Sequence, residues 1–238
     1  ELTASAGRGI GGFIAQTWPI VGGQLVFPPG YLAPVYHHGR AAGGVCIADE
    51  VQTGLGRMGT SFWAFEAQGV VPDIVVMGKP LGNGHPLAAV ATTRAIADAF
   101  DNGMEFFSTF GGNTVSCAVG LAVLDVVRDE RLQERARQVG DDMGARLRAL
   151  ATRHDIVGDV RGSGLFWGVE LVRDRSTLEP AGAEAGFVAN RMRERGILLG
   201  TDGPYHNVVK IRPPMPFTAD DGNLVVLELE SALRQRPG

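Results

Sequence analysis

Short apolar runs separated by glycine- and proline-rich turns make up the first half of the chain. Four runs have the length and branching of buried strands, and they lie at 12–16, 45–48, 74–77 and 87–93. A helix is expected between the first two, at about 34–42. Because strand and helix signals alternate through short links, the pattern favours a mainly parallel sheet covered on both faces. This half of the chain therefore predicts an α/β domain.

After Asn113 the apolar residues recur every three or four positions. This spacing predicts one helix over about 115–126 and a longer one over about 132–150. A half-solvated strand follows, predicted from the alternation of Leu165, Trp167, Val169 and Leu171. The remaining expected elements are a helix at about 183–195, strands at 197–199 and 208–211, and a final helix capped by Thr218 and Asp221.

The length of 238 residues suits one large domain or two unequal ones. We expect 1–127 to form part of a large α/β domain, 128–153 to form a connecting helix, and 154–238 to form a small C-terminal α+β domain. The chain starts with Glu1 and reaches its first predicted strand almost at once, so we interpret it as a piece that begins within a domain.

Composition excludes several classes of function. The net charge is −4 and no Lys/Arg cluster occurs, which argues against nucleic acid as a partner. No apolar run approaches 18 residues, so no membrane span is expected, and a cytoplasmic protein is the simplest interpretation. The five His residues lack the spacing of metal ligands, so we predict no metal site.

One lysine stands out chemically. Of 22 basic residues, 20 are Arg, and only Lys79 and Lys210 are Lys. Lys79 follows the apolar run 74–77 in a Gly/Pro/Asn-rich turn, and ligands of α/β sheets bind at the carboxyl ends of the strands. A lysine amine can lose its proton and attack a carbonyl carbon, whereas a guanidinium cannot. Lys79 is therefore a candidate for Schiff-base chemistry, and the alternative is a solvated loop lysine.

Asp49 is the candidate partner of Lys79, since it ends another apolar strand 30 residues earlier. A carboxylate there is either a structural helix cap, a general base, or the group that keeps a pyridine nitrogen protonated. At about 4 Å and an effective dielectric of about 20, that last attraction amounts to roughly 4 kcal/mol. Val51 could then pack on the ring, and Gln52 could donate to its phenolic oxygen.

Two stretches match the G-x-G-x-x-G pattern of dinucleotide-binding proteins. Gly7-Gly9-Gly12 precedes a predicted strand instead of following one. Gly54-Gly56-Gly59 follows a strand only after four further residues and opens no convincing helix. A dinucleotide site needs its glycines in the tight turn between strand and helix, so we reject this function.

Three long motifs now carry a resemblance to a known family. The segments IADEVQTGLGRMG, VVPDIVVMGKPLGNGHPLAAV and FFSTFGGNTVSCAVGLAVLDV resemble the class III aminotransferases, which depend on pyridoxal 5′-phosphate (PLP) and have PLP-dependent transferase fold type I. The resemblance implies that Lys79 forms the Schiff base, Asp49 pairs with the pyridine nitrogen, Val51 and Gln52 contact the ring, and Thr109 reaches the cofactor phosphate of a neighbouring subunit. A homodimer with shared active sites is implied.

Within the family the chain most resembles the alanine–glyoxylate-aminotransferase-like branch, which includes phospho-lyases. It resembles roughly the carboxy-terminal half, so the family's phosphate-binding loop lies upstream of residue 1. Gln16 stands where the family usually has Glu, and Lys210 stands where carboxylate-binding members have Arg. A compact ammonium suits a phosphate better than a carboxylate, and an ordinary edge-strand charge is the alternative for Lys210.

The sequence therefore predicts a PLP-dependent enzyme that acts on a primary amine. We favour elimination of phosphate from an O-phospho-amine. One alternative is true transamination from an amine or ω-amino acid to a keto acid. The other is a non-catalytic half-enzyme that serves as a partner subunit.

Overall fold

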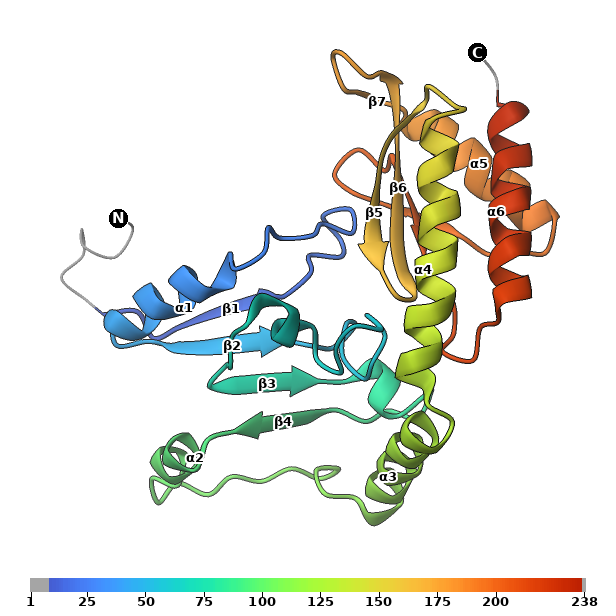
Figure 1. Cartoon of the computed structure of the whole chain (residues 1–238). Helices are drawn as coiled ribbons and strands as arrows, with labels where there is room; N and C mark the ends of the chain where they lie inside the picture. The colour runs from blue at the N-terminus through green and yellow to red at the C-terminus, as the bar shows by residue number, and fades with distance from the viewer. Residues whose placement is uncertain (1–8, 237–238) are drawn as a thin grey trace. The chain divides into compact units, whose positions relative to one another are not determined.

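The computed structural model describes residues 9–236, which belong to two compact units with interleaved sequences (Figure 1). Unit 1 comprises Glu1–Thr17, Phe27–Leu55 and Phe62–Glu130. Unit 2 comprises Trp18–Val26, Gly56–Ser61 and Arg131–Gly238. Each unit is described by itself below, and the division at residues 127 and 153 expected from the sequence stays a prediction.

Unit 1 contains a four-stranded sheet in the order β1-β2-β3-β4. Its strands are β1 (Gly12–Gln16), β2 (Val45–Asp49), β3 (Ile74–Met77) and β4 (Ala89–Thr92). The first three run parallel and β4 runs antiparallel to β3. The α/β class is confirmed, with a mixed sheet. The reversal of β4 is possible because the link from β3 contains no crossover helix, which a parallel neighbour would need.

One face of this sheet packs against α1 (Leu32–Ala41), as Figure 1 shows. Alternate residues of β2, Cys46 and Ala48, are buried under Leu32 and Tyr36 of the helix. An ion pair fastens the helix to the sheet, since Arg40 Nη2 lies 3.0 Å from Asp73 Oδ1, just before β3. This core fixes the direction of β2 and β3 and therefore the place where their carboxyl ends emerge.

Two short 3-10 helices and two α-helices complete unit 1. They are η1 (Ala64–Gln68), η2 (Lys79–Leu81), α2 (Arg94–Phe100) and α3 (Thr114–Asp129). The predicted helix after Asn113 is confirmed, and the Asn113 side chain caps it by accepting from the amides of Val115 and Ser116. Its predicted apolar face is not buried within the described chain, because Val115 is 63% exposed and α3 buries Gly120 and Val127 instead.

Unit 2 is an antiparallel sheet with three long helices. The main sheet has the order β5-β6-β9-β8, with β7 paired to β6. The strands are β5 (Val157–Ser163), β6 (Phe166–Asp174), β7 (Glu179–Pro180), β8 (Gly200–Asp202) and β9 (Val208–Ile211). The helices are α4 (Leu132–Ala151), α5 (Gly182–Glu194) and α6 (Ala219–Arg234).

The helices bury one face of this sheet. Trp167, Val169, Val209 and Ile211 share a core with apolar residues of α4, α5 and α6. The predicted helices of this region are confirmed, and so is the cap of α6, where Thr218 Oγ1 accepts from the Asp221 amide. The strand expected at 197–199 was placed three residues too early, and β5 was missed because its sequence, VGDVRGS, does not alternate cleanly.

The prediction that β6 is half-solvated was wrong. Phe166 and Gly168, on the face away from the helices, are also buried. Segment 18–26 covers them: Trp18 packs edge-on against Phe166 at 5.9 Å between ring centroids, and the Cβ of Gln24 approaches Gly168 so closely that a side chain there would collide. Sequence periodicity could not reveal this cover, because the covering segment lies more than 130 residues upstream.

Among residues 9–236, no helix combines the length and the apolar character that crossing a membrane requires.

Candidate active site

The two candidate catalytic residues lie at the carboxyl ends of neighbouring parallel strands. Asp49 is the last residue of β2 and pairs in register with Val76 of β3. Lys79 follows Val76 by three residues and opens η2 directly after β3. Figure 1 shows both strands running in the same direction toward this edge of the sheet. The arrangement matches the general location of ligand sites in open α/β sheets.

The backbone at Lys79 adopts an unusual conformation. Its φ angle is +35°, in the left-handed region that non-glycine residues occupy only at a cost of about 1–2 kcal/mol. The turn is held by hydrogen bonds from the Leu81 amide to the Gly78 carbonyl at 2.9 Å and from the Gly82 amide to the Lys79 carbonyl at 3.3 Å. A strained conformation maintained by its surroundings is typical of a functional position.

Val51 lies against this turn. Its Cγ1 is 3.5 Å from the position that a Cβ atom on Gly78 would occupy. The Val51 side chain therefore flanks the residue before Lys79, while the Val51 amide donates to Asp49 Oδ1 at 3.0 Å. The structure thus brings Asp49, Val51 and Lys79 together. Gln52 follows Val51 in the same turn and is partly buried.

The Asp49 carboxylate retains an open oxygen. Oδ1 accepts from the Val51 amide, and Oδ2 has no hydrogen-bond donor among residues 9–236. The same is true of the Lys79 ammonium, which has no acceptor or ion-pair partner within the described chain. A carboxylate oxygen and an amine of this kind, on adjacent strand ends, are available to a ligand.

Gln16 joins the same edge of the sheet. It ends β1 and pairs in register with Asp49. Parallel partners project their side chains to the same side of a sheet, so Gln16 and Asp49 share a face, opposite the one that α1 covers. The sequence prediction of Gln16 as a substrate contact is therefore compatible with the strand register.

Thr109 is not brought to this edge within the chain. It lies in the exposed segment 101–113 between α2 and α3, which Figure 1 shows running along the outer side of β4. No contact of Thr109 with Asp49 or Lys79 occurs in the part of the chain that the structure describes. Its predicted contact with the cofactor of a neighbouring subunit stays a prediction.

Lys210 belongs to unit 2 and already has a partner. It lies on β9, between β6 and β8, so it is not an edge-strand residue. Its Nζ is 2.9 Å from Asp202 Oδ1, and Gln24 Nε2 donates to the other Asp202 oxygen at 2.7 Å. The carboxylate neutralises much of the ammonium charge, so Lys210 alone is a weak anchor for an anionic substrate group.

Two polar residues near Lys79 were not predicted. Glu50 is fully buried although it follows Asp49 directly, and His85 Nε2 lies 2.8 Å from Ser116 Oγ, which links the turn after Lys79 to the first turn of α3. Strand alternation gave a signal for Glu50, because Cys46, Ala48 and Glu50 fall on the face that α1 covers. The His85 contact had no signal in the sequence.

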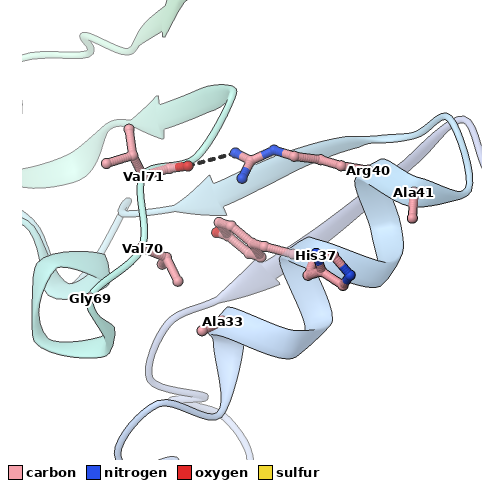
Figure 2. A pocket seen from close by; sticks show the side chains of 8 residues that line it. Ala33, His37, Arg40, Ala41, Gly69, Val70 and Val71 are labelled. Carbon is pink, nitrogen blue, oxygen red and sulfur yellow. Dashed lines mark hydrogen bonds between the residues drawn. The ribbon is translucent and has the colours of Figure 1, made fainter.

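A shallow hollow elsewhere in unit 1 does not compete as an active site. Figure 2 shows it between α1 and the loop before β3, with Ala33, His37 and Val71 on its rim. Its cation, Arg40, is engaged by Asp73 and by the Val71 carbonyl, to which Nη2 donates at 2.6 Å. Burial raises the pKa of Tyr36 to about 12, so its hydroxyl stays protonated near neutral pH. The hollow offers no reactive group.

Comparison with known proteins identifies the family. The family model for class-III aminotransferases matches residues 1–233, so the chain belongs to this family. It is 47% identical over 229 residues to an alanine–glyoxylate aminotransferase 2-like protein of Drosophila melanogaster, covering 95% of this chain and 46% of that protein. It is 45% identical over 231 residues to an ethanolamine-phosphate phospho-lyase homolog of Caenorhabditis elegans, covering 95% of this chain and 48% of that protein.

A solved structure gives the same result. A phospholyase from Arthrobacter in complex with phosphoethanolamine superposes with a TM-score of 0.95 at 41% identity, covering 98% of this chain and 56% of the other. The chain thus spans about half the length of the relatives it matches. Enzymes of this family depend on PLP, which confirms the predicted cofactor class and the alanine–glyoxylate-aminotransferase and phospho-lyase resemblance.

Proposed function

We propose that this chain supplies the lysine-bearing part of a PLP-dependent enzyme that acts on a primary amine and eliminates phosphate from an O-phospho-amine. The proposal is carried by one observation: Asp49 and Lys79 end neighbouring parallel strands, each with a polar atom open to a ligand within the described chain. Membership of the class-III aminotransferase family supports it.

The residues at this edge fit the cofactor chemically. Lys79 Nζ is the amine for covalent attachment, and the open Asp49 oxygen is an acceptor for a pyridinium N–H. The Val51 side chain, next to the Lys79 turn, offers an apolar surface for one face of the ring, and Gln52 offers an amide donor for its hydroxyl. When bound, PLP supplies an electron sink for the carbanion formed at the substrate carbon.

Lys79 then acts twice. Its Nζ, once exchanged for the substrate amine, is a free base that takes the proton from the substrate Cα. Asp49 keeps its negative charge opposite the ring nitrogen throughout, and the roughly 4 kcal/mol of attraction stabilises the protonated ring. If the adjacent substrate carbon carries phosphate, the phosphate leaves with its electron pair. If it carries none, the proton is returned by Lys79 and the outcome is transamination.

Two observations favour a phosphorylated amine as the substrate. Relatives of 45% and 41% identity are named for phospho-lyase activity, one of them in complex with phosphoethanolamine. Lys210 lacks the bidentate fork with which arginine grips a carboxylate. The Lys210–Asp202 pair means that a phosphate at this position would also need further cations, and Arg212, two residues along β9's path, is the nearest in sequence.

The substrate assignment is tested with the holoenzyme. We expect it to release phosphate from phosphoethanolamine without any keto acid, because elimination needs no amino acceptor. The measurement is inorganic phosphate release, run beside a panel of ω-amino acids with a keto acid. Turnover of the amino acids with no phosphate release would contradict the phospho-lyase assignment and leave transamination. Failure of borohydride to label the protein in the presence of PLP would leave the non-catalytic partner subunit.

We further propose that the enzyme is a homodimer in which Thr109 reaches the cofactor phosphate of the partner. Apolar side chains are gathered on the exposed segment around Thr109: Phe106, Phe107 and Phe110 are each more than 70% exposed. Large exposed apolar patches of this kind mark interaction surfaces. A second copy of the chain is the partner that the shared-site arrangement requires. A cytoplasmic location stays a prediction.

Mixed dimers test the shared site. Lys79→Ala and Thr109→Glu variants are each expected to be nearly inactive, since the first lacks the amine and the second repels the phosphate. In a heterodimer of the two, one site carries both defects and the other carries neither. We therefore expect re-association to restore about a quarter to a half of wild-type activity per dimer. Absence of any restoration, with heterodimers verified by mass, would place Thr109 in its own subunit's site or in none.

A further inference from the structure

Glu50 is a buried carboxylate that the proposed chemistry does not use. Its exposed fraction is 0%, and it follows Asp49 directly on β2. Successive residues of a strand point to opposite faces, so Glu50 points into the core under α1 while Asp49 points to the face that also carries Gln16. The Glu50 amide extends the ladder by donating to the Val76 carbonyl at 2.9 Å.

Four donors converge on the Glu50 carboxylate. Oε1 accepts from Thr17 Oγ1 at 3.2 Å and from the Phe65 amide at 2.9 Å. Oε2 accepts from Thr53 Oγ1 at 2.9 Å and from the Ala64 amide at 3.0 Å. The donors come from three segments: the end of β1, the turn after β2 and the start of η1. Within residues 9–236, Glu50 takes part in no ion pair.

This donor set selects an ionised carboxylate. Each oxygen faces one hydroxyl and one backbone amide, and a backbone amide cannot reverse to become an acceptor. A side-chain amide at this position would direct its NH₂ group at one of those N–H groups. Burial raises the pKa of Glu50 and the four donors oppose that rise. A charge kept in the core at this cost has a purpose beyond packing.

The carboxylate closes the turn that carries the candidate cofactor contacts. Thr53 is tied to Glu50 through its side chain, and the Gly54 amide donates to the Glu50 carbonyl at 3.1 Å. Val51 and Gln52 lie between these two anchors, and the Val51 amide in turn holds Asp49 Oδ1. Fixing residues 50–54 therefore fixes the direction of the Asp49 carboxylate.

We propose that Glu50 is a positioning residue for the cofactor: its ionised carboxylate clamps β1, the 50–54 turn and η1 together, so that Asp49 and Val51 are held in place for the pyridine ring. This inference rests on the proposed function. It assigns to Glu50 an effect on the electronic state of bound PLP, which a purely structural core residue would not have.

The test compares Glu50→Gln with a matched control in the holoenzyme. Glu66→Gln is the control, because Glu66 also accepts from two backbone amides at the start of η1 but is exposed and has no link to the 50–54 turn. For Glu50→Gln we expect PLP affinity to fall about tenfold or more, the scale of one lost hydrogen bond to a charged group. The pH midpoint of the absorbance change of bound PLP should also move to higher pH, since a poorly held ring nitrogen withdraws fewer electrons.

Thr53→Val and Glu50→Asp keep the test decisive if Glu50→Gln does not fold. Thr53→Val removes one donor and should shift both quantities in the same direction by a smaller amount. Glu66→Gln should shift neither. If the variants lower the melting temperature while PLP affinity and the absorbance midpoint stay at wild-type values, Glu50 is structural only and the inference fails. If wild type itself takes up no PLP, the proposed function fails instead.

Discussion

Lys79→Ala should abolish turnover of phosphoethanolamine, with a decrease of roughly 10⁴-fold or more. The substitution removes both the amine that holds the cofactor and the base that takes the Cα proton, and general-base catalysis alone contributes about 10²–10⁴-fold. Borohydride reduction with PLP should label the peptide around Lys79 in wild type and leave the variant unlabelled. The assay is single-turnover kinetics together with peptide mapping.

Two controls separate chemistry from charge and folding. Lys79→Arg keeps the positive charge at the strand end but cannot give up a proton near neutral pH, so it should be as inactive as Lys79→Ala. Arg94→Ala removes a cation from the surface of α2, where the side chain is 90% exposed, and should leave activity unchanged. Normal borohydride labelling in Lys79→Ala, at any other residue, would refute the assignment of Lys79.

The placement of the Asp49–Lys79 pair could be predicted because it depends on local signals. Each residue ends a short apolar run, and the strands at 12–16, 45–49 and 74–77 fall within a residue of their predicted bounds. Parallel strands joined by short links emerge at one edge, so two sequence positions 30 apart were expected to meet. Glu50 was predictable from the same alternation, since its neighbours Cys46 and Ala48 are core residues.

Other features depend on contacts that no local pattern encodes. The exchange of segments 18–26 and 56–61 into unit 2 is one of them. Gly56 and Gly59 were rejected as a dinucleotide motif, and the structure gives their actual requirement: both have positive φ, and a side chain on either would collide with Gln133 or Arg137 of α4. The Lys210–Asp202 pair is another example, because its two residues are joined only by the register of β8 and β9.

Asp49→Asn should lower kcat by about 10³-fold while leaving the covalent attachment of PLP intact. The neutral side chain loses the roughly 4 kcal/mol attraction to a ring N–H, which corresponds to about three powers of ten. Asn Oδ1 can still accept from the Val51 amide, so the turn should keep its shape, and the amide then directs an N–H at the ring nitrogen. Activity and the borohydride label should therefore separate in this variant, whereas Lys79→Ala loses both.

Asp49→Glu is the matched control for charge. It restores the negative group about one methylene further along and should recover part of the lost kcat, which Asn cannot do. The absorbance spectrum of bound PLP is the second measurement, because only an altered ring protonation changes it in Asp49→Asn relative to wild type. A variant with Asn at 49 that keeps wild-type kcat and spectrum would mean that the carboxylate faces no ring nitrogen, and the meaning of two strands ending side by side would then have to lie in the lysine alone.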